Sequence, residues 1–417
     1  MGRSIRARRR ALTPPVPRTA QRGKPADAPR LTVLRVAPRT KALGRRKLRL
    51  AGTPRLRIWT YRLWLIGATA ALMLALLWLQ QLLGAVPAHP TTLQRGIQWA
   101  ELIWLAPVPL SLALWLGWLL FAEAARPSPP ATDVPLLTRK RRGVTLPTRL
   151  VFRFATRGDN REVLRESVAA VHAAFDRAAF VTGPYRVEIV TERAFDIADA
   201  PGLVATYVVP ARYATPAGSR YKARALAYLQ AETHPQPEDW HIYLDEESVV
   251  DAAFVAGVYR FIRRALTRRR GHRQAPVIGQ GPILYQGGHW FFRGADALRT
   301  ADDLGRFRLQ YALGMPLFGV HGSYLVLRGV DDARLAFDVG PRNSLTEDAA
   351  WALRAWARGY RFAWVEGYLR EQPPQRVRDF VRQRARWLSG IRLVIQDAAV
   401  PRRYRACLAM FTLLWQV

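Results

Sequence analysis

Two long apolar runs, each free of charged residues, most constrain what this chain can fold into. They extend from Leu63 to Ala85 and from Leu102 to Ala122. A helix of about 20 apolar residues crosses the roughly 30 Å hydrocarbon core of a bilayer. The alternative is a pair of buried core helices, for which runs of this length are not needed. We therefore expect transmembrane helices at 58–86 and 98–122.

The charge beside these runs sets the expected orientation. Residues 1–62 contain 19 Lys and Arg and a single acidic residue, so they carry more than half of the net charge of +33. A second basic group, 139–142, follows the second run, whereas residues 87–101 contain one basic residue, Arg95. Cytoplasmic flanks of membrane helices are enriched in Lys and Arg. We expect an integral membrane protein whose N-terminus and catalytic part are cytoplasmic.

Composition excludes several classes of protein. Residues 1–57 are rich in Pro, Arg and Ala without apolar periodicity, which indicates a disordered basic tail. Membrane topology and attraction to anionic lipid explain its charge, and no nucleic-acid-binding module accompanies it, so we expect no nucleic-acid partner. A single cysteine excludes a disulfide framework and a Cys-cluster zinc site. Only five of the 64 basic residues are lysine, which we take to indicate a bacterial source and hence the plasma membrane.

After a basic linker at 123–147, residues 148–375 alternate between strand-like and helical patterns, which indicates an α/β domain with a mostly parallel sheet. The expected strands are Arg149–Ala155, Tyr185–Thr191, Trp240–Leu244, Val277–Tyr285 and Phe362–Val365, and the expected helices include Arg161–Ala179 and Lys222–Glu232. Ligands of such sheets bind at the carboxyl ends of the strands.

The C-terminal part returns to membrane-related patterns. Residues 376–396 place apolar side chains on one face of a helix, as an amphipathic helix at the membrane interface does, so we assign 376–398 to such an element. The final 12 residues, 406–417, are uncharged and too few to span a bilayer. We expect them to begin a further transmembrane helix.

Acidic residues end one of the expected strands. Asp245 and Glu247 lie two residues apart after Trp240–Leu244, so both point to the same side of an extended segment. Paired carboxylates are oxygen ligands for Mg²⁺ or Mn²⁺, and such an ion bridges a nucleotide diphosphate. A solvated acidic turn is the alternative that this pair alone leaves open.

A second acidic motif is Ser344-Leu-Thr-Glu-Asp348, which opens a helix that continues to Arg358. Ser344 and Glu347 fit the S-x-x-E pattern of a capping box. Asp348 is then free on the first turn, where it is a candidate general base for a sugar hydroxyl.

Basic residues form two further candidates. Gln383, Arg386 and Trp387 share one side of the C-terminal helix, and Arg384 lies near its apolar stripe, where a cationic group is suited to stabilise a leaving diphosphate. Lys222, together with Arg224, is suited to hold phosphate. The alternatives are a basic helix on anionic lipid and a solvated helix face.

The order of these motifs along the chain, K-A-R-A-L, D-x-E, T-E-D and Q-x-x-R-W, resembles that of membrane-integrated family 2 glycosyltransferases with a Rossmann-like GT-A fold. Further segments are similar to the egghead-type β-1,4-mannosyltransferases. They are Ile278–Tyr285, Arg299–Gly305, Pro316–Tyr324, Val365–Gly367 and Arg382–Ile391.

The resemblance implies a function and a role for each matching residue. It implies transfer of a sugar with inversion of its anomeric configuration to a lipid-linked or glycan acceptor at the cytosolic membrane face. The resemblance indicates that the sugar is mannose, from GDP-mannose as in that family. Asp245 and Glu247 would bind the metal and diphosphate, and Asp348 would be the catalytic base. The remaining roles are nucleotide binding by Glu192, Lys222 and Arg224, a gate over diphosphate and acceptor formed by Gln383, Arg384, Arg386 and Trp387, and acceptor-proximal positions at Gly322, Ser323 and Glu347.

Two other functions stay open. A processive β-glycan synthase of the cellulose or mannan type, using a UDP- or GDP-sugar, shares the Q-x-x-R-W motif. A non-catalytic membrane scaffold with a basic tail is the remote alternative, and it leaves the ordered acidic motifs unexplained.

Overall fold

The computed structural model of the chain describes residues 67–68, 70–79, 81–82, 89, 91–105, 138–141, 144–178, 183–195, 203–268 and 277–415. The expected tail at 1–57 and most of the expected linker lie outside these residues. Contacts divide the chain into Met1–Ala51 and Gly52–Val417, and everything below concerns the second unit.

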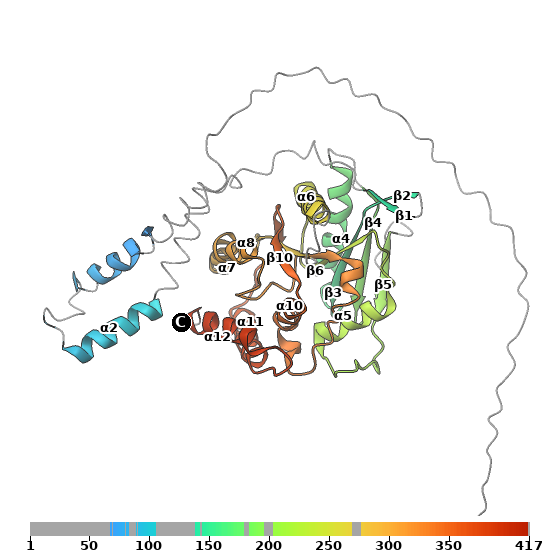
Figure 1. Ribbon diagram of the computed structural model, residues 1–417. Helices are drawn as coiled ribbons and strands as arrows, with labels where there is room; N and C mark the ends of the chain where they lie inside the picture. Colours follow the sequence, from blue (N-terminus) through green and yellow to red (C-terminus); the bar gives the residue numbers. More distant parts are fainter. Residues whose placement is uncertain are drawn as a thin grey trace, which may run out of the picture. The chain divides into compact units, whose positions relative to one another are not determined.

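A seven-stranded mixed sheet forms the centre of the α/β part (Figure 1). Its strand order is β10-β7-β9-β6-β3-β4-β5. The pairs among β3, β4, β5 and β6 and the pair β7–β10 are parallel, whereas β9 is antiparallel to both of its neighbours. The strands are β3 Arg149–Thr156, β4 Tyr185–Thr191, β5 Val204–Val208, β6 Asp239–Asp245, β7 Val277–Gln280, β9 Leu325–Arg328 and β10 Arg361–Trp364.

The expected α/β class and mostly parallel sheet are confirmed, with two differences. Strands β5 and β9 were not predicted from the sequence. The single strand predicted over Val277–Tyr285 is wrong, because the strand is interrupted at Gly281-Pro282. The second half becomes β8 (Ile283–Tyr285), which pairs in parallel with β11 (Leu369–Glu371) in a separate two-stranded sheet.

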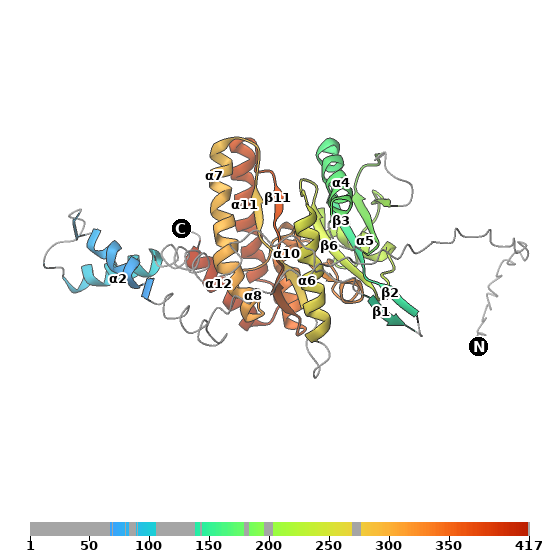
Figure 2. The same cartoon turned by 90° about the horizontal axis from the view of Figure 1, so that it is seen from above.

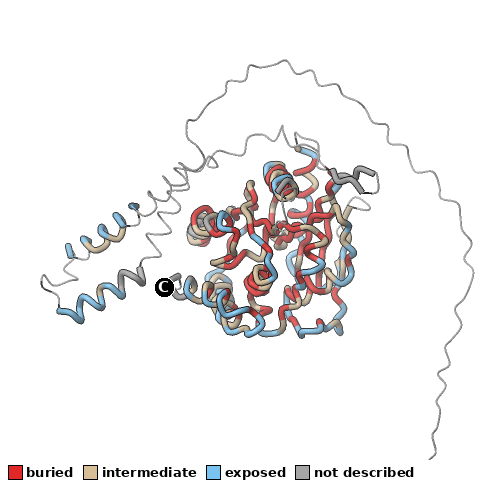
Figure 3. Tube along the Cα trace, viewed as in Figure 1, coloured by how far each residue is buried: buried red, intermediate tan, exposed pale blue. Residues whose placement is uncertain are grey.

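Helices cover both faces of the large sheet (Figure 1). Helices α4 (Arg161–Asp176) and α6 (Ala252–Arg268) pack on one face, and α5 (Tyr221–Glu232) and α10 (Glu347–Ala357) pack on the other. Side chains alternate along the strands between these two cores: Ile242 and Leu244 of β6 join the first, and Tyr243 joins the second. The buried trace in Figure 3 therefore follows the strands and the inner sides of these helices.

The remaining elements lie beside this sandwich or before it. Before the sheet in sequence come α2 (Thr92–Leu105) and a hairpin of β1 (Thr138–Arg141) and β2 (Val144–Pro147). Between β8 and α10 the chain forms α7 (Trp290–Asp302), the π-helical turn η2 (Asp303–Phe307), α8 (Arg308–Leu313), α9 (Gly329–Asp332) and the 3₁₀ turn η3 (Asn343–Leu345). The last two described helices are α11 (Val377–Ile395) and α12 (Arg402–Trp415). In Figure 2, α7 and α11 lie side by side. Helix α11 agrees with the helix expected at 376–396.

The expected transmembrane helices fall largely outside the described residues. Helix α2 begins at Thr92, six residues before the expected start of the second span, and residues 106–122 are not described. Within the part of the chain that the structure describes, no helix has both the length and the hydropathy that crossing a membrane requires. The two spans stay predictions.

A close backbone contact fixes α6 against the end of the sheet, and it yields a stability prediction. A Cβ atom on Gly257 of α6 would lie 1.5 Å from the carbonyl oxygen of Glu366. Backbone cannot yield as a flexible side chain does, so Gly257→Ala should lower the free energy of unfolding by about 2–3 kcal/mol or more. Chemical denaturation followed by circular dichroism measures this loss.

Gly294→Ala is the matched control, because Gly294 also lies in a helix, α7, and a Cβ there meets nothing within 4 Å. This change should leave stability unchanged or raise it by about 0.5–1 kcal/mol. Equal effects of the two substitutions would show that the α6 contact does not matter.

Candidate active site

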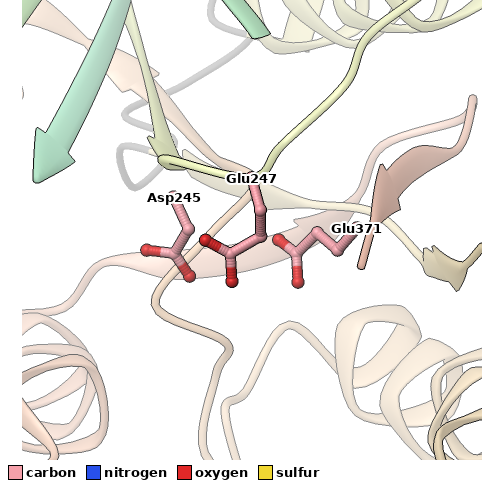
Figure 4. Close-up of side chains that lie close together, drawn as sticks. All are labelled: Asp245, Glu247 and Glu371. Carbon is pink, nitrogen blue, oxygen red and sulfur yellow. The ribbon is translucent and has the colours of Figure 1, made fainter. Parts of the chain in front are cut away.

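Asp245 and Glu247 leave the carboxyl end of β6 on the same side, as their spacing predicts (Figure 4). Glu246, between them, turns the other way, where it accepts hydrogen bonds from Asn160 Nδ2 at 2.5 Å and from the Thr156 hydroxyl. Glu246 and Glu247 are the central residues of a turn that the backbone hydrogen bond from the Ser248 N–H to the Asp245 carbonyl oxygen closes at 3.1 Å. This turn places two carboxylates at the edge of the sheet and uses the third to tie β6 to the loop after β3.

A third carboxylate, Glu371, joins this pair from β11 (Figure 4). One carboxylate oxygen from each of Asp245, Glu247 and Glu371 lies within 4.8 Å of the other two. Glu371 is buried and accepts a hydrogen bond from the Ser248 hydroxyl at 3.1 Å. Glu371 was not predicted from the sequence, because a three-residue strand carries no detectable period. Its position just before Pro373-Pro374 could have marked a strand end.

Lys222 provides the positive charge at this cluster. It lies in the first turn of α5, and its ammonium donates to Asp245 Oδ1 and, at 3.0 Å, to the carbonyl oxygen of Gly322. Glu347 Oε1 lies 4.0 Å away. Burial alone would lower the pKa of Lys222, but the carboxylates of Asp245 and Glu347 outweigh it and raise that pKa above its ordinary value. Lys222 therefore stays charged.

Glu347 and Asp348 begin α10 directly opposite this lysine. A Cβ on Gly322 would lie 3.2 Å from Asp348 Oδ2, 3.3 Å from Lys222 Nζ and 3.6 Å from Glu347 Oε1, so the glycine lets three charged groups converge. The structure thus brings together the predicted residues Lys222, Gly322, Glu347 and Asp348.

The predicted capping box is wrong. The N-cap of α10 is Thr346, and no side chain caps it. The Ser344 hydroxyl instead donates to the carbonyl oxygen of Gly340 at 2.7 Å and accepts from the backbone N–H of Arg220 at 2.8 Å. Ser344 lies two residues before this N-cap, in η3, so Glu347 is available to the site.

Carboxylates that lie close together in a partly desolvated site have raised pKa values. Burial and the neighbouring Asp348 raise the pKa of Glu347 to about 7, and burial and Asp245 raise the pKa of Glu371 to about 7. Burial, followed by Asp245 and Glu371, also raises the pKa of Glu247 well above its ordinary value. Burial raises the pKa of Asp348 as well. Perturbed carboxyls of this kind gather at functional sites.

Ser323 connects the strand end to the turn that carries Gly322. Its buried hydroxyl lies 3.1 Å from the Ser248 hydroxyl and 3.4 Å from the backbone nitrogen of Asp245. Its carbonyl oxygen accepts from Gln280 Nε2 at 3.0 Å. Ser323 therefore helps to position the carboxylates of Asp245 and Glu371, through the backbone of the first and through Ser248.

The gate residues lie on α11. Trp387 contacts two guanidinium groups, with Arg299 Cζ and Arg384 Cζ each 4.5 Å from its ring centroid. Arg384 also pairs with the buried carboxylate of Asp296 on α7 and donates to Gln383 Oε1 at 2.7 Å. Since Arg384 is committed to these partners, its predicted contact with diphosphate stays a prediction.

Arg386, the residue before Trp387, extends from α11 toward the start of α10. Its guanidinium donates to the carbonyl oxygen of Leu345 at 3.1 Å, directly before α10. Arg386 is also near enough to act on the pKa of Asp348. Close packing allows this approach, because a Cβ on Gly390 of α11 would lie 2.6 Å from the side chain of Thr346.

Glu192 and Arg224 pair with each other, with Arg224 Nη1 3.3 Å from Glu192 Oε1. Arg224 also donates to the carbonyl oxygens of Pro210 at 2.7 Å and Tyr213 at 2.9 Å, which holds the loop after β5. Within the described residues, no hydrogen bond or ion pair joins this pair to the carboxylate cluster. The two form a separate ion pair, between the residue after β4 and the first turn of α5.

Three comparisons place the chain among known proteins. Residues 240–417 match the family described as glycosyl transferase family group 2. The chain is 31% identical, over 343 residues, to the β-1,4-mannosyltransferase bre-3 of Caenorhabditis elegans, which covers 80% of this chain and 70% of that protein. It is 32% identical, over 275 residues, to the β-1,4-mannosyltransferase egh of Drosophila melanogaster, covering 64% and 57%.

Solved structures give more distant likenesses. A mannosyltransferase of Pyrobaculum calidifontis, in complex with GDP-Man and Mn²⁺, is 15% identical with a TM-score of 0.42, covering 75% of this chain and 81% of that one. TarS of S. aureus, in complex with UDP-GlcNAc, is 10% identical with a TM-score of 0.39, covering 63% and 71%. By its identity and coverage with bre-3, the chain belongs to glycosyl transferase family group 2 and, within it, to the family of these β-1,4-mannosyltransferases.

Proposed function

We propose that this chain is an inverting mannosyltransferase with a GT-A fold, which transfers mannose from GDP-mannose in β linkage to a lipid-linked or glycan acceptor. The observation that carries the proposal is the convergence of Asp245, Glu247, Lys222 and Asp348 at one edge of the sheet in a member of this family. Candidate metal ligands, a fixed cation and a candidate base lie together there.

On the donor side, Asp245, Glu247 and Glu371 would hold Mg²⁺ or Mn²⁺. The donor set fits, since three carboxylates supply hard oxygen ligands and the Glu247 carboxylate has no side-chain partner among the described residues. Such an ion, when bound, offsets the charge of the diphosphate as the glycosidic bond breaks. Lys222 adds a fixed positive charge beside it, and Arg386, Gln383 and Trp387 cover the diphosphate from α11.

On the acceptor side, Asp348 takes the proton of the attacking hydroxyl. Its raised pKa suits a general base, because a stronger base removes a proton more readily. The acceptor attacks from the face opposite the nucleotide, so the configuration inverts without a covalent enzyme intermediate. Glu192 and Arg224 would bind the base or ribose of the nucleotide.

A membrane location is part of the proposal. Trp290 and Phe291 of α7 and Val377 and Val381 of α11 are exposed, and contact between Phe292 and Phe380 joins the two helix ends. Exposed arginines flank them, at 293, 378 and 382. Apolar side chains framed by basic ones suit the surface of an anionic bilayer.

The activity is tested with purified full-length protein in lipid, offered GDP-mannose, UDP-glucose and UDP-N-acetylglucosamine with Mn²⁺. GDP-mannose should give the highest turnover, and Asp348→Asn should lower it by about 10²–10⁴-fold, because the amide cannot accept the proton. Release of the nucleotide diphosphate measures the rate, and product length distinguishes a single addition from a polymer.

Asp176→Asn, an exposed change on α4, is the matched control and should retain full activity. Equal turnover of Asp348→Asn and the unaltered protein would contradict the assignment of the base. A preference for a UDP-sugar would contradict the donor.

Metal binding should depend on pH. A carboxyl must lose its proton to bind metal, and the pKa of Glu371 is about 7. The apparent Kd for Mn²⁺, measured by electron paramagnetic resonance without donor, should therefore fall about tenfold between pH 6 and pH 8. A higher pH thus strengthens metal binding but destabilises the metal-free protein. Its free energy of unfolding should fall as pH rises from 4.5, the ordinary pKa of a glutamate, through 7, because ionising a buried carboxyl destabilises the folded state.

Glu371→Gln should weaken Mn²⁺ binding at pH 8 toward the level seen at pH 6, whereas the exposed Glu162→Gln should not. Equal affinities at the two pH values, with no effect of Glu371→Gln, would remove Glu371 from the metal site.

The membrane contact predicts a change of polarity at Trp290, which is 70% exposed. A polarity-sensitive fluorophore on Trp290→Cys, in a Cys407→Ser background, should emit at shorter wavelength when anionic lipid nanodiscs replace a short-chain detergent. The same label on Glu162→Cys should not shift. A label at Trp290 that reports water in nanodiscs would refute the contact.

A further inference from the structure

The site contains a pair of residues that the proposed mechanism does not use, Asp303 and His321. Asp303, at the start of η2, is 1% exposed, and its Oδ1 lies 2.5 Å from His321 Nε2. Its Oδ2 accepts from the backbone N–H of Ile283 at 3.0 Å. The buried carboxylate is thus fixed by the strand on one side and holds the imidazole on the other.

His321 is held from several further directions. Its ring stacks on Phe307, with centroids 4.6 Å apart and planes 10° apart. Gln280 binds both backbone groups of His321, accepting from its N–H at 3.0 Å and donating to its carbonyl oxygen at 2.8 Å. Asp303 and Phe307 thus hold the imidazole ring, and Gln280 holds the backbone that carries it.

The imidazole lies next to the reacting groups. The following residue, Gly322, accepts from Lys222 through its carbonyl and approaches Asp348 Oδ2. His321 is also close enough to act on the pKa of both Asp348 and Glu371. It therefore lies close to the candidate base Asp348 and to the carboxylate of Glu371.

The hydrogen bond to Asp303 decides which nitrogen carries the proton. A carboxylate only accepts hydrogen bonds, so Nε2 carries the hydrogen, and Nδ1 of the neutral ring keeps a lone pair. Among the described residues, no group is hydrogen-bonded to Nδ1, and the side chain is 15% exposed. A lone pair repels the acceptor oxygens of a phosphate but accepts the O–H of a sugar. Nδ1 thus suits a sugar hydroxyl and not the donor diphosphate, and the kinetic test below distinguishes an acceptor hydroxyl from one on the donor.

We propose that Asp303 and His321 form an acceptor-binding pair, in which Nδ1 of His321 accepts a hydrogen bond from a hydroxyl of an uncharged glycoside and Asp303 holds the ring in the required tautomer. The proposal rests on the proposed function. His321 touches the acceptor, and Asp303 is a positioning residue that acts through it. The bound hydroxyl fixes the sugar so that its neighbour faces Asp348.

The test separates binding of the acceptor from chemistry on the donor. Full-length protein in lipid is given GDP-mannose and Mn²⁺ with the octyl β-glycosides of glucose, mannose and N-acetylglucosamine as acceptor probes. Release of GDP without a probe measures transfer to water. His321→Gln keeps a group at the position of Nε2 and loses Nδ1, so KM for the accepted glycoside should rise about tenfold or more. KM for GDP-mannose and transfer to water should stay within about twofold.

Two further variants distinguish recognition from a structural role. His321→Asn places an amide oxygen near the position of Nδ1 and should recover part of the loss. Asp303→Asn keeps an oxygen for Ile283 but donates to Nε2, which moves the ring proton to Nδ1. It should therefore raise the acceptor KM with little effect on transfer to water. His234→Gln, an exposed change before β6, is the matched control and should alter neither constant.

Three results would overturn the proposal. One is an unchanged acceptor KM in His321→Gln. Another is a parallel fall in transfer to water and to glycoside, which would place His321 on the donor or in the fold. The third is unaltered protein that hydrolyses GDP-mannose but gains no rate from any of the glycosides. Unaltered protein that releases no GDP at all would instead refute the proposed function.

Discussion

The ammonium of Lys222 is the interaction on which the site depends. Five carboxylates, those of Asp245, Glu247, Glu347, Asp348 and Glu371, gather at one edge of the sheet, and Lys222 is the cation in contact with the first of them. Carboxylates that are close together and partly desolvated repel one another or take up protons. The raised pKa values of Glu347 and Glu371 indicate that Lys222 offsets only part of this repulsion. A site left short of positive charge is suited to a divalent cation.

Topology explains how residues so far apart in sequence meet. Asp245 ends β6, Lys222 begins α5, Gly322 precedes β9, Asp348 begins α10 and Glu371 ends β11. The carboxyl ends of parallel strands open at one edge of the sheet, and the helices that follow or precede them start there too. The antiparallel strand β9 brings the Gly322 turn to the same edge, because its N-terminal end pairs beside the end of β6. The candidate metal ligands and the candidate base thus face each other across one strand end.

Much of this arrangement followed from the sequence, and the misses have physical causes. Residue type and spacing placed Asp245, Glu247 and Asp348 at the ends of elements, and the bounds of β4 agree with those expected. Short strands such as β9 and β11 are set by their partners and carry little pattern of their own, so Glu371 was not found. Ser344 matched a capping pattern, yet a 3₁₀ turn intervened. The pairing of Arg384 with Asp296 depends on the packing of α7 against α11, which no local pattern encodes.

The central claim is that Asp348 deprotonates an acceptor that attacks from the face opposite the nucleotide, beside a metal held by carboxylates at the end of β6. The anomeric configuration of the first product formed from GDP-α-D-mannose tests it most directly. Nuclear magnetic resonance of the isolated product, read from the one-bond carbon–hydrogen coupling at the transferred anomeric carbon, distinguishes the two anomers. The account predicts a β-mannoside. An α-mannoside would contradict it, because retention requires a different geometry of attack at this edge of the sheet.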